Sequence, residues 1–147
     1  MSTKEEIINL LNHALELEHT ANIQYLAHAE LVDGLNAEPI IKRLQEIAGD
    51  EAEHAKKFRT LIGDFLGGEP SMGMAKPKRA STIKEILETN LKDEMDAVDT
   101  YKKILEKINA SKAELPYEFL RLEHDVRHVI MEEQEHISEL KILLGLK

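Results

Sequence analysis

Glutamate and histidine stand three residues apart at two places where the flanking pattern predicts the apolar side of a helix. The first pair, Glu51 and His54, lies in GDEAEHAKKF (residues 49–58), and the second is Glu133 with His136. Burying a carboxylate and an imidazole in hydrocarbon is costly unless each finds a partner. Residues three apart project from one face of a helix, so each pair can offer both ligands to one metal ion.

Apolar residues recur in steps of three and four along four segments of the chain, and every one of these stripes contains a glutamate near its middle. Both halves of the chain also place a tyrosine seven residues after a glutamate, which puts Tyr25 and Tyr101 two helical turns beyond Glu18 and Glu94 on the same face. We therefore expect two similar halves related by a pseudo-two-fold axis. The four glutamates are Glu18, Glu51, Glu94 and Glu133.

Four carboxylates in one dry interior repel one another strongly, whereas two divalent cations would balance their charge. Neutral imidazole is a normal ligand of iron, and carboxylate-rich sites also accept manganese. We therefore predict two iron ions per chain, with manganese as an alternative, and with Glu51 and Glu133 bridging both ions. One ion would take Glu18, Glu51 and His54, and the other Glu94, Glu133 and His136.

Other polar residues fall outside the apolar stripes. Glu16 and His19 have the same spacing as the two pairs but are out of phase with their stripe, so we expect a surface pair. Glu46 and Asp50 are expected on a solvated face, with passage of Fe(II) inward or a position on the interior of a cage as the alternatives. A second stripe near the C-terminus favours a surface or subunit contact; its members are His124, His128, Glu132 and Glu135.

Composition limits the class of protein. The chain has 147 residues, a net charge of −9 and no cysteine. Helix-forming residues dominate, which predicts an all-α fold in a single domain spanning residues 1–147. The acidity makes nucleic-acid binding unlikely, and polar residues interrupt every apolar run too often for a membrane span. The start MSTKEEII lacks the organisation of a signal peptide, so we expect a cytoplasmic protein.

Helix boundaries follow from capping and breaker residues. We expect helices at about residues 3–33, 37–66, 82–109 and 115–144, with Gly34 ending the first and Pro116 in the first turn of the last. The two short connections imply antiparallel neighbours, and the long one between the second and third helices can cross the length of a bundle. The prediction is an antiparallel four-helix bundle with up-down-down-up topology.

The stretch EHTANIQYL, with Glu18, Ala21, Gln24 and Tyr25, resembles the first helix of bacterioferritins in the ferritin-like di-iron superfamily, as do the two Glu-x-x-His pairs. The resemblance covers nearly the whole chain, although the connection between the third and fourth helices is longer. It implies a ferroxidase centre formed by the six residues above, oxidising Fe(II) with O₂ or H₂O₂ for iron storage or detoxification. It also implies that Tyr25 lies beside the ligands.

Two departures qualify what this resemblance implies. Bacterioferritins carry a haem-ligating Met directly after the first bridging glutamate, where this chain has Ala52, so the resemblance does not extend to haem binding there. The chain also ends after the fourth helix, without the fifth helix of many 24-subunit ferritins. A homo-oligomer is expected, and a dimer, a 12-subunit shell and a 24-subunit shell all stay open.

Two other functions remain as alternatives. A rubrerythrin-like peroxide reductase usually carries a cysteine-ligated iron, which a chain without cysteine cannot hold, and an additional carboxylate, for which Asp96 and Asp99 are out of phase. In a noncatalytic protein, the metal or a buried polar network would only hold the bundle together.

Overall fold

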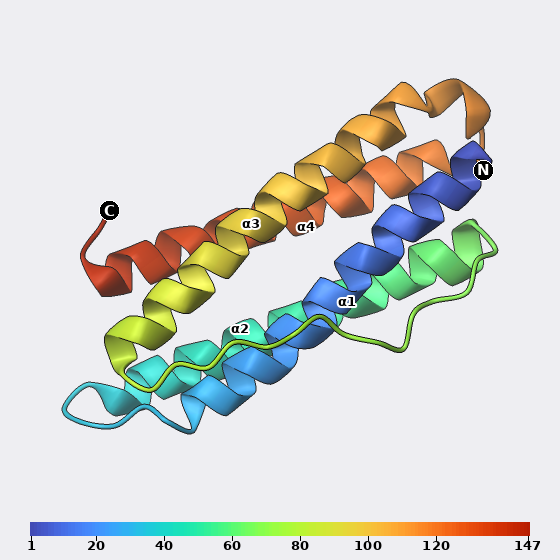
Figure 1. Cartoon of the computed structure of the whole chain (residues 1–147). Coiled ribbons are helices and arrows are strands. Elements are labelled where there is room, and N and C mark those ends of the chain that lie inside the picture. The colour runs from blue at the N-terminus through green and yellow to red at the C-terminus, as the bar shows by residue number, and fades with distance from the viewer.

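Four long helices make up the protein, which the computed structural model describes over residues 1–147 (Figure 1). Shorter elements follow the second and third helices: the π-helical turn η1 (Leu61–Phe65) and the 3₁₀ turn η2 (Lys112–Glu114). There is no strand, and the prediction of an all-α four-helix bundle is confirmed. The long helices are α1 (Thr3–Ala29), α2 (Ala37–Thr60), α3 (Ile83–Ala110) and α4 (Phe119–Leu144).

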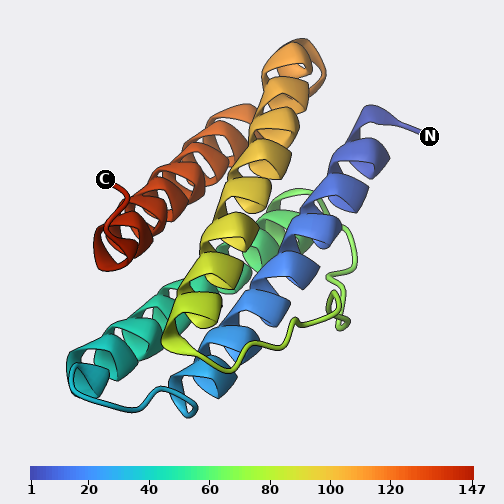
Figure 2. The ribbon, with the colours of Figure 1, turned by 60° about the vertical axis from the view of Figure 1, so that its left-hand side comes forward.

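The helices pair as two antiparallel hairpins, α1 with α2 and α3 with α4, packed against each other (Figure 1). The segment 67–82 contains no helix and returns along the length of the bundle beside α1, as Figure 2 also shows. As a result α2 and α3 run in the same direction. The expected up-down-down-up topology with a long crossover is confirmed.

Capping residues explain where three of the helices begin or end. Ser2 and Glu5 form a reciprocal capping box at α1, with Ser2 Oγ accepting from the Glu5 amide at 3.2 Å. Thr82 Oγ1 accepts from the Glu85 amide at 3.1 Å at the start of α3. Gly145 ends α4 with a φ of 73°, a left-handed conformation that suits glycine.

Two helix ends differ from the expected ones. The first helix ends at Ala29 rather than near residue 33. After Ala29 the backbone changes to hydrogen bonds between residues three apart, and the amide of Leu31 donates to His28 O at 3.0 Å. The last helix begins at Phe119 rather than at 115. The ring of Pro116 disfavours helical dihedrals in the residue before it, and Leu115 accordingly has φ −127° and ψ 58°.

The apolar core is divided into two clusters along the bundle axis. One lies toward the start of α1 and includes Leu11, Phe58 and Val126. The other lies toward its end and includes Leu44, Ile47 and Leu140. The buried polar residues of the predicted metal site belong to neither cluster, so a polar layer interrupts the core at mid-helix. None of the four helices is both long enough and apolar enough to cross a lipid bilayer.

Candidate metal centre

Each helix contributes buried polar side chains to this layer. Glu18 comes from α1 and Glu94 from α3, while α2 and α4 each supply a glutamate and, one turn later, a histidine. All six side chains are at most 3% exposed. The helical period explains the arrangement, since the sequence places each of them in phase with leucine, isoleucine and valine residues that must be buried. The six residues are Glu18, Glu51, His54, Glu94, Glu133 and His136.

The structure brings these six residues together as two overlapping groups. Within each group, one ligand atom from every member lies within 4.8 Å of the others. Glu51 and Glu133 belong to both groups, and the ring centroids of His54 and His136 are 6.2 Å apart. The first group adds Glu18 and His54, and the second adds Glu94 and His136.

One buried atom of each of the six residues has no hydrogen-bond partner. Buried polar atoms in folded proteins are nearly always paired, so six orphans in one place indicate a missing partner. The two imidazoles turn Nδ1 inward: Nδ1 of His54 lies 2.8 Å from Glu133 Oε1, yet not in hydrogen-bonding geometry. Carboxylate oxygens and imidazole nitrogens, all pointing into one space, are a donor set that fits divalent iron or manganese. The orphaned atoms are Glu18 Oε2, Glu51 Oε1, His54 Nδ1, Glu94 Oε2, Glu133 Oε1 and His136 Nδ1.

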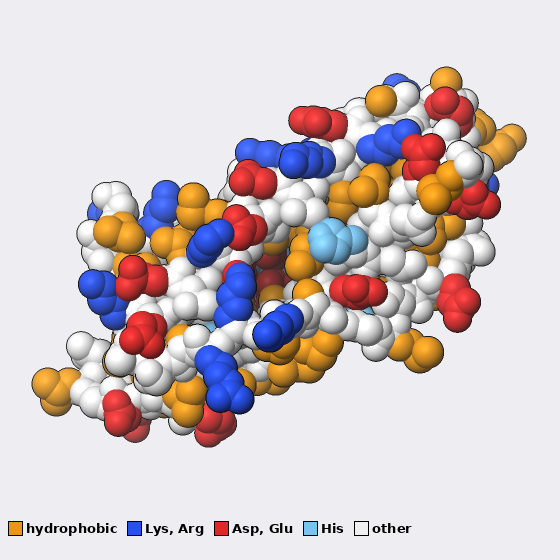
Figure 3. Space-filling view, in the orientation of Figure 1, with side chains coloured by type: hydrophobic (Ala, Val, Ile, Leu, Met, Phe, Trp, Pro, Cys, Tyr) orange, Lys and Arg blue, Asp and Glu red, His pale blue; other side chains and the backbone are white.

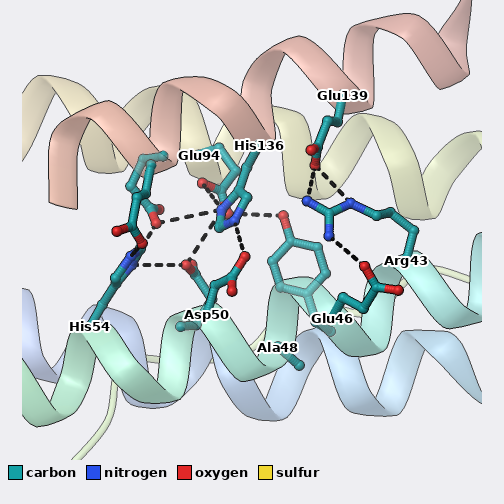
Figure 4. Close-up of polar contacts among 12 residues, drawn as sticks. Arg43, Glu46, Ala48, Asp50, His54, Glu94, His136 and Glu139 are labelled. Atoms are coloured by element: carbon teal, nitrogen blue, oxygen red, sulfur yellow. Dashed lines mark hydrogen bonds and ion pairs between the residues drawn. The ribbon is translucent and has the colours of Figure 1, made fainter. Parts of the chain in front are cut away.

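The outer nitrogen of each imidazole is held by a carboxylate from the opposite hairpin. His54 Nε2 donates to Oε2 of Glu132 at 2.6 Å. His136 Nε2 donates to Oδ2 of Asp50 at 2.9 Å (Figure 4). These bonds hold a proton on Nε2, so Nδ1 is the nitrogen that can bind a metal once its own proton is displaced. Asp50, expected on a solvated face, and Glu132, expected at a surface or subunit contact, are both part-exposed, but the sequence analysis did not foresee that both also contact the site. The sequence signal was the acidic residue directly before each of Glu51 and Glu133.

Tyrosine hydroxyls support two of the glutamates. Tyr25 of α1 donates to Glu94 Oε1 at 2.9 Å, and Tyr101 of α3 donates to Glu18 Oε1 at 2.8 Å. Both tyrosines are 1% exposed. Each tyrosine thus orients a carboxylate of the other hairpin, and the second oxygen of that carboxylate has no hydrogen-bond partner.

Burial raises the pKa of each of these carboxylates, but their neighbours shift the final pKa values in opposite directions. Burial, followed by the charge of Glu133, raises the pKa of Glu18 to about 7. Burial and neighbouring carboxylates also raise the pKa values of Glu51 and Glu94 well above the ordinary value of 4.5. Burial would raise the pKa of Glu133 too, but the contacts with His136 and His54 outweigh it and lower that pKa. Without metal, one carboxylate therefore holds its charge more firmly than the others.

The imidazoles respond to the same carboxylates. Burial by itself would lower the pKa of His54, but Glu133 and Glu18 raise it to about 11. Glu133 and Glu94 likewise outweigh burial and raise the pKa of His136 to about 11. Both rings are thus protonated at neutral pH in the metal-free protein, and these protons are the charges that a bound cation would replace.

A hollow of about 280 Å³ reaches the site from the face formed by α1, α3 and the crossover. Figure 3 shows acidic atoms at the bottom of a recess in this face, with basic side chains around it. Glu18, Glu94 and both tyrosines line the hollow, together with charged residues from its outer part. The charged residues are Lys76, Lys78, Asp93 and Asp96.

A buried polar network that the sequence analysis missed holds the crossover beside this hollow. Gln24 Oε1 accepts from the Lys78 amide at 2.7 Å, and Gln24 Nε2 donates to Asn90 Oδ1 at 3.0 Å. Asn90 Nδ2 donates to His28 Nδ1 at 2.9 Å, and His28 Nε2 donates to Lys78 O at 2.9 Å. Asn90 follows Leu87 by three residues, which was the signal that it faces the core.

The other polar residues singled out in the sequence lie elsewhere. Ser71 Oγ donates to Glu16 Oε2 at 2.5 Å and His19 Nδ1 donates to Gly73 O at 2.7 Å, so this pair fastens the crossover. Glu46 accepts from Arg43 at 2.9 Å, and Arg43 also pairs with Glu139 (Figure 4). The side chain at the position of the bacterioferritin haem ligand, Ala52, is exposed and offers no ligand atom.

The fold and this cluster together define a four-helix bundle of the carboxylate–histidine class. The chain belongs to the Ferritin family, whose model, described as the ferritin-like domain, matches residues 8–146. A curated bacterioferritin from Brucella melitensis biotype 1 is 35% identical over 103 residues. The match covers 69% of this chain but spans only about 63% of the length of that relative.

Solved structures agree over almost the whole chain. A ferritin-like, diiron-carboxylate protein from Bacillus anthracis superposes with a TM-score of 0.87 and 28% identity, covering 100% of both chains. Bacterioferritin from Rhodobacter capsulatus, described with a metal-free dinuclear site and a haem iron, has a TM-score of 0.81 and 26% identity, covering 97% of this chain and 85% of its own. The protein is thus a bacterioferritin-like member of the ferritin family with a buried carboxylate and histidine cluster.

Proposed function

We propose that the six buried residues bind two iron ions and that the protein is a ferroxidase. One ion would be held by Glu18 and His54 and the other by Glu94 and His136, with Glu51 and Glu133 shared. The observation that carries this proposal is the set of six buried atoms without a hydrogen bond, one from each residue, in two groups that share two members. Two divalent ions supply four positive charges, which balance the four carboxylates.

Fe(II) is the substrate in this proposal. Two Fe(II) ions supply two electrons, enough to reduce H₂O₂ to water or O₂ to H₂O₂, and they become Fe(III). The protein would hold the ions close together, and the apolar clusters shield the layer from water along the bundle axis on both sides. Glu132 and Asp50 keep both imidazoles in the tautomer that binds metal, while the tyrosines hold the orientations of Glu18 and Glu94.

Iron storage or detoxification follows from the resemblance to bacterioferritins, and it requires assembly of several chains. Exposed apolar side chains at the end of α1 and in the turn that follows it are consistent with a homo-oligomer; they include Ile23 and Leu26 of the helix and Leu31 of the turn. The mass in solution, measured by light scattering, tests this part of the proposal. Twelve or 24 chains would support storage in a cavity, whereas a dimer would favour removal of O₂ or H₂O₂ without storage.

Stopped-flow absorbance of Fe(III) after mixing Fe(II) with O₂ or H₂O₂ tests the activity. The parent protein should oxidise about two Fe(II) per chain rapidly, and Glu51→Ala and Glu133→Ala should slow this phase to the rate without protein. Glu53→Gln removes an exposed carboxylate from the same helix and should leave the rate unchanged. Binding of two metals without faster oxidation would instead assign the cluster a structural role. A strong preference for H₂O₂ would favour a peroxide reductase.

A further inference from the structure

Two histidines on the outer face of α4 lie outside the centre described above. His124 and His128 are one helical turn apart, and their rings stack with centroids 4.1 Å apart and an interplanar angle of 27°. The side chain of His124 is 52% exposed. Histidines at this spacing are near neighbours on one helical face, and their rings can direct two nitrogens at a single ion.

A carboxylate orients the first of these rings. Nδ1 of His124 donates to Oδ1 of Asp125 at 3.0 Å, and Asp125 is only 13% exposed. With the proton on Nδ1, the lone pair of His124 is on Nε2, directed away from Asp125. A carboxylate behind an imidazole is the usual support of a metal-binding histidine, and the buried centre has the same arrangement at both of its histidines.

The neighbouring cationic side chains are engaged in ion pairs. Arg127 Nε donates to Glu123 Oε1 at 2.7 Å, and Arg121 lies 3.6 Å from Asp125. The net charge of the chain is −9, so the surrounding field favours cations. The two rings are therefore accessible to a divalent ion without an opposing free charge from either arginine.

The same face of α4 leads from this pair to the buried centre. Glu132 follows His128 by one turn, and Oε2 of Glu132 accepts from Nε2 of His54 at 2.6 Å. Along the helix, His124, His128 and Glu132 are separated by steps of about 6 Å. Glu132 is part-exposed, so its carboxylate faces both the solvent and the centre.

We propose that His124 and His128 bind one divalent transition-metal ion on the surface of α4, and that this site loads the buried centre past Glu132. The chemical class is an ion that accepts imidazole nitrogen, such as Fe(II), Co(II) or Zn(II). Metal binding by His124 and His128 does not depend on the proposed function, whereas loading of the buried centre rests on the proposed dinuclear site.

Titration calorimetry with Zn(II) separates these claims, with His124→Ala/His128→Ala as the test variant. The parent should bind three ions per chain and the double variant two. If the buried centre binds no metal but the surface site exists, the parent should bind one ion per chain and the double variant none. Two ions in both proteins would overturn the surface site and leave the centre intact. Circular dichroism provides a check that the variant is folded, and both substitutions replace exposed or part-exposed residues with a good helix former.

Two further variants test the geometry of the pair. His128→Met combined with Met131→His keeps the number of histidines but separates the rings by two turns, about 10 Å, so the third ion should be lost. Asp125→Asn should keep the third ion but weaken its binding about tenfold, because the orienting carboxylate is removed. Retention of a third ion of unchanged affinity in the rearranged variant would show that the pair is not a chelate.

The loading role has its own measurement. Uptake of Co(II) into the centre, followed by its visible absorption with metal below the protein concentration, should be several-fold slower in His124→Ala/His128→Ala, with the final absorption unchanged. An unchanged rate would overturn the loading role, whatever the Zn(II) counts show.

Discussion

Tyr25 of α1 donates its hydroxyl hydrogen bond to Glu94 of α3, at 2.9 Å, and thus joins the two hairpins at the centre. Tyr101 repeats this contact in the opposite direction, to Glu18. The imidazoles are also supported from the opposite hairpin, His136 by Asp50 and His54 by Glu132. Each of these hydrogen bonds joins a residue of one hairpin to a proposed ligand of the other. A substitution in one hairpin should therefore weaken binding of the ion held mainly by the other hairpin.

Removing one hydroxyl tests this crossed support. Tyr25→Phe should weaken metal binding at the position held by Glu94 and His136 by about 10-fold to 100-fold, because Glu94 loses the bond that orients it. Tyr101→Phe should do the same at the position held by Glu18 and His54. Calorimetric titration of both variants with Zn(II) resolves the weakened ion. Full affinity in both variants would show that the hydroxyls only fill the core.

Neutralising the carboxylates behind the imidazoles should also weaken metal binding. We expect Asp50→Asn and Glu132→Gln each to lower affinity about 10-fold or more, since the amide no longer fixes the tautomer of the ring. Glu53→Gln is the matched control, because Glu53 is exposed on α2 and is not bonded to either histidine. Equal affinities in all three variants and the parent would contradict a positioning role for Asp50 and Glu132.

The sequence predicted the bundle because the helical period and the polar interruptions repeat four times. Periodicity shows which side of a helix is buried, but not which residue of a neighbouring helix it meets. The tyrosines were therefore placed on the correct face, while their crossed partners were not foreseen. The contacts of Asp50 and Glu132 with the imidazoles were not foreseen either, because a residue at the edge of a buried stripe can reach both water and the interior, and the sequence does not show which.

Metal binding should release protons. The pKa values of His54 and His136 are both raised to about 11, so both rings carry a proton at neutral pH that a metal ion must displace. If each ion displaces one imidazole proton, the affinity for each ion should rise about tenfold per unit increase in pH near neutrality, and the product of the two binding constants about 100-fold. An indicator dye in weakly buffered solution measures the release on adding Zn(II). Binding without proton release would contradict the protonated metal-free state.

The stability of the metal-free protein should depend on Glu18. Its pKa is about 7 in the fold, against an ordinary value of 4.5, so the folded state binds this proton more tightly than the unfolded chain. The contribution of Glu18 to stability is therefore fully present below about pH 4.5 and is lost as the pH rises through about 7.

Glu18→Gln keeps the shape of the side chain without the charge. At pH 8 the metal-free variant should be more stable than the parent by a few kcal/mol, and the difference should shrink toward pH 5. Urea unfolding in the presence of a chelator measures both values. With metal added the order should reverse, because the variant lacks a proposed ligand. A variant that is less stable than the metal-free parent at both pH values would contradict the account of Glu18.

The central claim is that six inward-facing side chains share two metal ions. Anomalous diffraction from crystals loaded with Fe(II) under anaerobic conditions tests this directly. We predict two iron peaks within the bundle, one contacted by Glu18 and His54 and the other by Glu94 and His136, with Glu51 and Glu133 touching both. A single peak, or iron bound only at the surface while the six side chains pair with one another, would contradict it.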